Sequence, residues 1–171
     1  SIAEAFIHAG ASQDTEVKLR WVYSGDLTEE NLAENFKGID GMLIAPGFGD
    51  RGIEGKILAA KFARENKIPL LGICLGMQIM TIEFARNVLG LKDANSAEFD
   101  LTTKNPVISL MEEQKNVVDK GGTMRLGALK CQLKPHTKLI ESYGNKNIPE
   151  RHRHRYEFNS DYLGDFEKNG L

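Results

Sequence analysis

A cysteine between two closely spaced glycines is the residue of this sequence best suited to chemistry. Cys74 lies in the stretch Gly72-Ile-Cys-Leu-Gly76, which has the spacing of the G-x-S-x-G elbow with cysteine in place of serine. Such an elbow turns sharply from a strand into a helix, and its glycines leave room for the turn. The pattern therefore predicts a nucleophile at Cys74. The alternative is a buried structural cysteine, and we keep that interpretation for Cys131, which has no such setting.

The segments on either side of Cys74 are those that an elbow requires. An apolar run at residues 69–73 predicts a strand, and residues 75–89 predict a helix closed by Gly90. The N-terminal end of a helix lowers the pKa of a thiol and raises its reactive thiolate fraction. The backbone N–H of Leu75 is free at this end, so it can donate to the oxyanion of a tetrahedral intermediate.

A glycine-rich loop at residues 46–52 is the candidate for a second oxyanion donor. It follows another apolar run, at residues 42–45. Gly47 and Gly49 let the backbone approach a ligand closely with its N–H groups turned outward. The alternative is an ordinary strand-to-helix turn. A phosphate-binding loop is not indicated, because the segment has neither the GxxxxGK[ST] pattern nor a complete GxGxxG.

Short apolar segments alternate with helical patterns in the first half of the chain, which is typical of an α/β fold. Further helices are predicted at residues 2–9, 28–36, 54–66, 139–143 and 161–169. Further strands are predicted at residues 16–23, 107–111 and 123–133. We predict one domain over residues 1–171, with a mostly parallel central sheet and helices on both faces.

The composition is that of an ordinary globular domain. Of 171 residues, 41% are hydrophobic and 27% charged, and the net charge is −2. Neither a nucleic acid nor a membrane is therefore expected as a partner. Two cysteines favour a reducing cytoplasm over a secreted disulfide scaffold. None of the four histidines has zinc-site spacing from a cysteine, so no metal site is predicted.

Five stretches together resemble a known family. Residues 72–78 are similar to the nucleophile motif of class I glutamine amidotransferases. Residues 47–55, 93–99, 121–127 and 150–159 look like the glutaminase domain of CTP synthases, and the resemblance runs in order along the whole chain. It implies hydrolysis of L-glutamine to glutamate and ammonia through a γ-glutamyl thioester on Cys74.

The resemblance also implies roles for individual residues. Gly47 and Leu75 would supply the oxyanion N–H groups, and Phe48 would line the pocket. Glu98 and Arg151 would bind the amino-acid end of the substrate, which suits a free amino acid with one ammonium and one carboxylate. The other residues implied to contact the substrate are Gly76, Met77 and Gln78. Arg51 matches a position that the family links to activation by GTP.

In this family the ammonia passes to a separate synthase domain, which uses ATP and Mg²⁺ to convert UTP to CTP. We expect no cofactor in the present domain and a homotetramer for the full-length protein. The family's catalytic histidine belongs to a His-Pro-Glu motif that this sequence lacks, so His152 and His154 are not assigned as the base. We expect a domain incomplete at both ends, without its first strand and its C-terminal strands, in a longer molecule.

Two other functions stay open. One is a different cysteine hydrolase on a similar sheet, such as a γ-glutamyl hydrolase or a peptidase-like enzyme. Glu98 and Arg151 argue against it, because they select a free amino acid over a peptide. The other is a non-catalytic regulatory or interaction domain that keeps the fold. Its support is the missing His-Pro-Glu motif, and the intact elbow at Cys74 argues against it.

Overall fold

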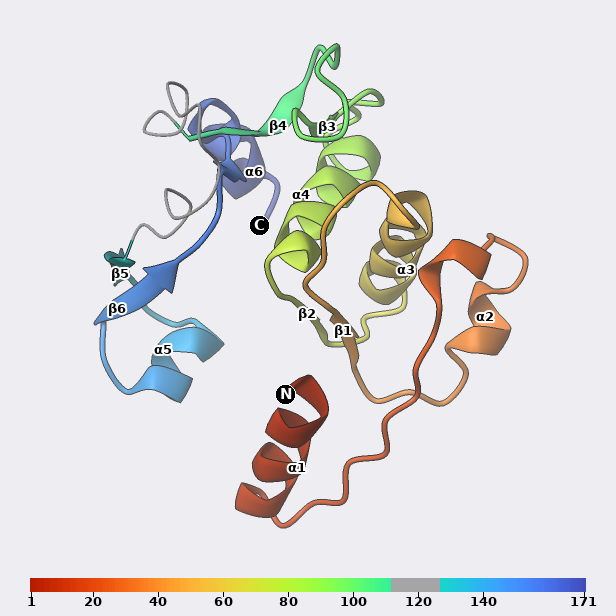
Figure 1. Cartoon of the computed structure of the whole chain (residues 1–171), viewed down its shortest axis with the longest axis vertical. Helices are drawn as coiled ribbons and strands as arrows, with labels where there is room; N and C mark the ends of the chain where they lie inside the picture. Colours follow the sequence, from red (N-terminus) through yellow and green to blue (C-terminus); the bar gives the residue numbers. More distant parts are fainter. Residues whose placement is uncertain (112–126) are drawn as a thin grey trace.

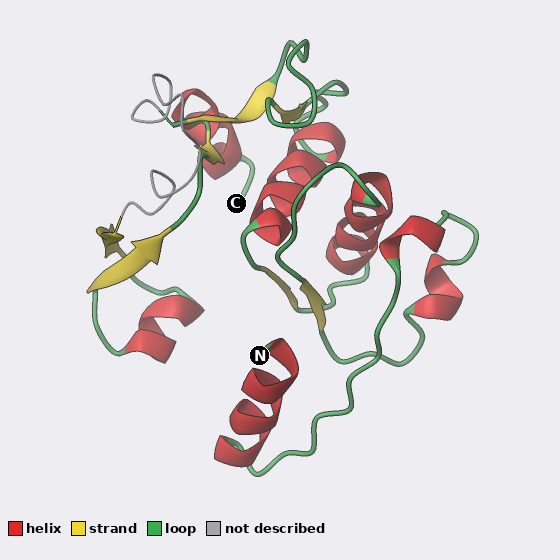
Figure 2. Cartoon of the chain, viewed as in Figure 1, coloured by secondary structure: helices red, strands yellow, loops and turns green. Residues whose placement is uncertain are grey.

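A computed structural model describes residues 1–111 and 127–171 of the chain. Helices and short strands alternate from α2 to β3, and the later helices are short (Figures 1 and 2). The described helices are α1 (Ile2–Ser12), α2 (Leu32–Asn35), α3 (Ile53–Glu65), α4 (Leu75–Asn87), α5 (Lys138–Tyr143) and α6 (Leu163–Lys168), with single turns η1 (Ser24–Asp26) and η4 (Ser160–Tyr162). The described strands are β1 (Met42–Ile44), β2 (Leu70–Gly72), β3 (Asn95–Ser96), β4 (Pro106–Leu110), β5 (Gly127–Gln132), β6 (Asn147–His152) and β7 (Tyr156–Phe158). The predicted α/β class is confirmed.

The described strands form three small sheets. β1 and β2 pair in parallel, with Ile44 opposite Gly72. β4 lies between β3, to which it is parallel, and β7, to which it is antiparallel. β5 and β6 form an antiparallel ladder of their own. Because β1 and β2 are parallel and in register, their carboxyl ends meet at one edge. The glycine-rich loop and the cysteine elbow both leave from that edge.

Helices α3 and α4 lie side by side (Figure 1) and pack against each other in the core of the fold. Ile79, Ile82 and Ala85 of α4 have no exposed surface. Arg64 of α3 binds Glu83 of α4, with its Nε 3.0 Å from Oε2 and its Nη2 2.8 Å from Oε1. A buried carboxylate needs such a partner, so this ion pair fixes the two helices against each other.

Two sequence predictions in the first part of the chain are wrong. Residues 16–23 form no strand: within the described chain the segment pairs with none of the strands, and Trp21 is 73% exposed. Alternating apolar residues make a strand only where a neighbour takes up the backbone hydrogen bonds. Helix α2 begins at Leu32 and not at residue 28. The Asn31 side chain accepts the Thr28 N–H (3.0 Å) and donates to the Asp26 carbonyl (2.8 Å), which stabilises a turn in place of the first helical turn.

The other predicted elements in the described chain are confirmed, with ends that move by a few residues. The first part of the strand predicted at residues 123–133 lies outside the described residues. None of the described helices has both the length and the apolar character needed to cross a membrane.

Candidate active site

Cys74 has a backbone conformation that residues other than glycine rarely adopt. It lies between β2 and α4, with φ 58° and ψ −110°. This region is strained for any residue other than glycine, and it persists only where the surrounding structure imposes it. Here the Gly76 N–H donates to the Ile73 carbonyl (2.9 Å) and the Met77 N–H to the Cys74 carbonyl (3.0 Å), which closes the turn. The predicted strand–elbow–helix geometry is confirmed.

The flanking glycines are required because backbone passes close to them. A Cβ atom on Gly72 would lie 2.5 Å from the carbonyl carbon and oxygen of Gly76. A Cβ atom on Gly76 would lie 2.2 Å from the carbonyl oxygen of Ile44, in β1. Real Cβ atoms essentially never come within 3.0 Å of such atoms. The two glycines therefore let the start of α4 sit directly against β1 and β2.

A cavity of about 250 Å³ opens at this elbow. Four segments far apart in the sequence supply its walls: the loop after β1, the elbow, the loop after β3, and the connection from β6 into β7. The lining residues are Gly47, Phe48, Gly49, Cys74, Leu75, Gln78, Glu98, Phe99, Arg153, His154, Arg155 and Tyr156. Seven residues singled out from the sequence thus share one cavity: Gly47, Phe48, Gly49, Cys74, Leu75, Gln78 and Glu98.

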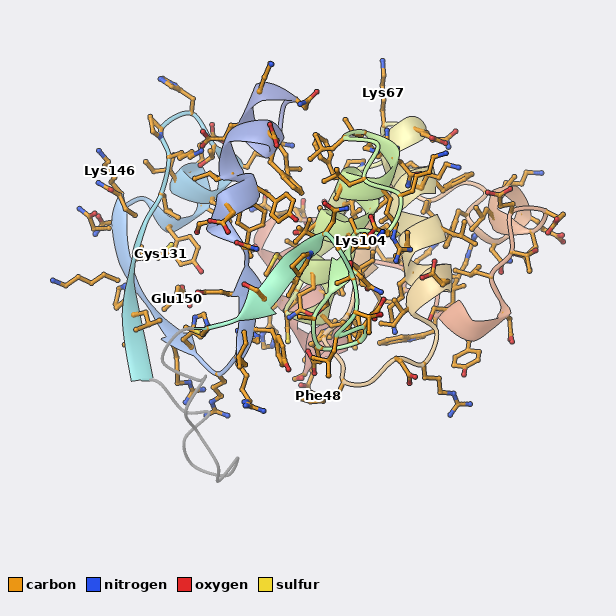
Figure 3. The ribbon with its side chains drawn as sticks, turned by 90° about the horizontal axis from the view of Figure 1, so that it is seen from above. Phe48, Lys67, Lys104, Cys131, Lys146 and Glu150 are labelled. Carbon is orange, nitrogen blue, oxygen red and sulfur yellow. The ribbon has the colours of Figure 1, made fainter. Side chains whose placement is uncertain are left out.

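The two candidate oxyanion donors come from touching segments. A Cβ atom on Gly47 would lie 3.3 Å from Cδ2 of Leu75, so the loop after β1 packs on the first residue of α4. Both residues line the cavity beside Cys74. Phe48 follows in the same loop and is 87% exposed. Figure 3 shows its side chain at the edge of the molecule.

Side chains of opposite charge line the cavity. Partial burial of its carboxyl group raises the pKa of Glu98, and the positive charge of Arg155 opposes that rise. The Nε of Arg155 and the Oε1 of Gln78 are buried and have no hydrogen-bond partner in the described structure. Unpaired buried polar atoms are uncommon, and these two belong to residues that line the cavity. They indicate a polar ligand.

The arginines that line the cavity are not the one proposed from the sequence. Arg151 lies on β6, paired with Ala128 of β5, and is exposed. It does not line the cavity, whereas Arg153 and Arg155 do. The reason is that β6 ends at His152, and the three residues before β7 leave the ladder. Sequence reasoning missed Arg155, although the arginine-rich run at residues 150–159 marked the right segment.

Three other predicted residues also lie outside the cavity lining. Gly76 is buried beneath β1, and Met77 is 39% exposed on the first turn of α4. Arg51 lines a separate, larger cavity of about 740 Å³, where its guanidinium carbon lies 5.6 Å from the ring centre of Tyr23. Phe99 lines both cavities and forms part of the wall between them.

The remaining cysteine and the paired histidines do not suggest a second site. Cys131 is in β5, well separated from Phe48 in Figure 3. The rings of His152 and His154 are 5.0 Å apart and nearly perpendicular. Burial, and secondarily the neighbouring His152, lower the pKa of His154. Among the described residues no group of three or more metal-binding side chains comes together.

Comparison with known proteins agrees with this geometry. The family model for class-I glutamine amidotransferases matches residues 1–171. CTP synthases of Cytophaga hutchinsonii and Bacillus subtilis are 61% and 54% identical to it over 171 residues. These matches cover all of this chain and 32% of each relative, so the chain spans about a third of their length.

A solved structure is also similar to the whole fold. It is the glutaminase domain of Trypanosoma brucei CTPS with bound acivicin, and it superposes with a TM-score of 0.88 at 37% identity. The match covers 99% of this chain and 65% of that chain.

Proposed function

This chain belongs to the class I glutamine amidotransferases, and from that premise we propose that it is the glutaminase domain of a longer CTP synthase. It would hydrolyse L-glutamine to glutamate and ammonia. The observation that carries the proposal is the strained conformation of Cys74 (φ 58°) at the start of α4, in a cavity that also holds Glu98 and Arg155. The first residue supplies the nucleophile, and the other two supply charges for a free amino acid.

Substrate recognition follows from the charges. Glu98 accepts hydrogen bonds from the α-ammonium group, and the buried Oε1 of Gln78 offers a second acceptor. Arg155 donates to the α-carboxylate, which gives its unpaired Nε a partner. Arg153 adds a second positive charge at the same wall. A peptide lacks this free pair of charges, so the cavity favours a single amino acid.

The chemical steps use the elbow. The Cys74 thiolate attacks the side-chain amide carbon of glutamine, and a C–S bond forms as the carbonyl oxygen becomes an oxyanion. The N–H groups of Gly47 and Leu75 donate to that oxyanion. Collapse of the intermediate breaks the C–N bond, and ammonia leaves after its nitrogen gains a proton. Water then attacks the thioester, which releases glutamate and restores the thiol. Following the resemblance, the base for these proton transfers is expected from a His-Pro-Glu motif outside this chain.

The rest of the activity is proposed for the longer protein. A synthase domain outside residues 1–171 would use ATP and Mg²⁺ to aminate UTP with the ammonia released here. The names of the relatives and the length that they share with this chain support this part of the proposal. A cytoplasmic homotetramer, and activation by GTP through Arg51, are further expectations from the resemblance. The cavity that Arg51 lines offers room for such a ligand.

The test uses the full-length protein that contains this chain. Cys74→Ala should abolish glutamate release and glutamine-dependent CTP formation, while CTP formation from added ammonium salt should continue. Cys131→Ala is the matched control and should retain both activities, because Cys131 lies in the β5–β6 ladder. Normal glutamine use by the Cys74→Ala protein would disprove the assignment. Loss of both activities would show that the substitution damages more than the glutaminase site.

A further inference from the structure

We propose that Ser96 is a positioning residue that holds Glu98 in place for the α-ammonium group of the substrate. The inference rests on the proposed function and extends it to a residue outside the cavity lining. Ser96 carries a buried hydroxyl oxygen that accepts a hydrogen bond from the backbone of a cavity residue.

Ser96 binds the backbone of the turn that contains Glu98. Its side chain has no exposed surface, and its Oγ accepts the backbone N–H of Glu98 at 3.1 Å. Its carbonyl oxygen accepts the N–H groups of Phe99 and Asp100, each at 3.0 Å. Three successive N–H groups are thus bound by one residue, which leaves the turn little freedom.

The turn is also tied to the sheet. Ser96 ends β3, which is two residues long and pairs with β4 through an irregular register, Asn95 opposite Pro106 and Ser96 opposite Ile108. The Ala97 N–H donates to the Ile108 carbonyl at 2.9 Å. Ile108 is itself fully buried. The strand therefore places Ser96, and Ser96 places the residue two positions later at the cavity.

Removal of the Ser96 hydroxyl group should loosen the turn at Glu98. In Ser96→Ala the Glu98 N–H loses its acceptor, and a donor without a partner drives the backbone to another conformation. The Glu98 carboxylate would then no longer be held at the ammonium position. Because Cys74 and the loop at Gly47 belong to other segments, the chemical step should be little affected. The expected result is weaker glutamine binding with an almost unchanged kcat.

The experiment separates positioning from a general structural role by comparing two ligands. Full-length protein is assayed for the KM of glutamine, and for the Ki of glutaramate, which is glutamine without its α-amino group. Ser96→Ala should raise the KM for glutamine by about tenfold, keep kcat within about twofold and leave the Ki of glutaramate unchanged. Glu98→Gln should show the same selectivity, and the double variant should add little to it, because both changes disturb one interaction.

Two further variants serve as controls for the Ser96→Ala experiment. Thr102→Ala removes another hydroxyl group of the same loop, which donates to Asp100 at 2.7 Å, and should match the wild type. Ser96→Cys keeps a small buried side chain with a much weaker acceptor, and it should show the selective loss if Ser96→Ala folds poorly.

The outcomes are distinct. Equal weakening of both ligands, or no change in either, would overturn the role of Ser96 even though the wild type hydrolyses glutamine. A wild-type protein that does not hydrolyse glutamine would overturn the proposed function, and this inference with it.

Discussion

Gly76→Ala tests whether close contact between α4 and β1 is needed for the reactivity of Cys74. Gly76 is buried, and the added Cβ would lie 2.2 Å from the Ile44 carbonyl oxygen and 3.0 Å from its carbonyl carbon. An ordinary contact begins near 3.4 Å, so the start of α4 must move away from β1 by about 1.2 Å. Both contacts are with backbone, which cannot rotate aside as a side chain would.

The size of the effect follows from two opposing terms. Extra atoms in a packed core destabilise by up to about 3 kcal/mol, and alanine is a better helix former than glycine by about 1 kcal/mol. We expect a loss of about 2 kcal/mol in the free energy of unfolding. A displacement of about 1 Å at a catalytic group costs roughly 100-fold in rate, so kcat/KM for glutamine should fall by that factor.

The assay measures glutamate release, thermal unfolding and the rate at which an electrophile modifies Cys74. Gly164→Ala is the control, because Gly164 lies in helix α6 and, apart from its chain neighbours and the nearby backbone of that helix, no atom lies within 4 Å of the position of the new Cβ. It should leave all three measurements near the wild type. If Gly76→Ala keeps a wild-type rate of Cys74 modification, the elbow tolerates a looser contact than the structure indicates, and the geometric argument fails.

Three further results are expected. Arg155→Gln should raise the KM for glutamine about tenfold or more through loss of a charged hydrogen bond, whereas Arg151→Gln should not; equal effects would favour the original assignment. Glu83→Gln should lower the free energy of unfolding by about 2 kcal/mol, below the range for fully buried pairs because Arg64 is 34% exposed; denaturant unfolding measures it. The raised pKa of Glu98 means that its carboxyl group protonates at a higher pH than usual. The KM for glutamine should therefore rise as the pH falls towards that pKa. In the Glu98→Gln protein the KM should not show this rise at low pH.

The elbow could be predicted from the sequence because its geometry depends on local spacing. A nucleophile between glycines two positions away on each side has few structural explanations, and in the structure a Cβ atom added to either glycine would lie within 2.5 Å of a backbone atom. The loop at Gly47 could be placed as well, since parallel strands bring their carboxyl ends to one edge. The candidate oxyanion donors and the candidate nucleophile could therefore be proposed from short stretches of sequence.

The arginine of the site could not be chosen in the same way. Arg151, Arg153 and Arg155 alternate in one run, and in an unbroken strand all three would point to one face. The strand ends at His152, and the direction of each later side chain depends on a turn that has no clear sequence signal. The tertiary path of the chain decides which arginines line the cavity with Glu98.

The segment at residues 16–23 failed for a related reason. Its alternating pattern describes one apolar and one polar face, but a strand also needs a neighbour for its backbone N–H and C=O groups. No local feature of the sequence predicts which segment would be that neighbour. In the described chain Arg20 instead donates to the carbonyl oxygens of Asn35 and Lys37, both at 3.0 Å. The segment is thereby held beside the end of α2.

The most direct test of the central claim is covalent capture of the nucleophile. Full-length protein is treated with acivicin, the ligand bound in the similar Trypanosoma brucei domain, and its peptides are examined by mass spectrometry. One adduct is expected, on Cys74; excess glutamine should prevent it, and it should be absent from the Cys74→Ala protein. An adduct on Cys131, or labelling of Cys74 that glutamine does not slow, would contradict the claim.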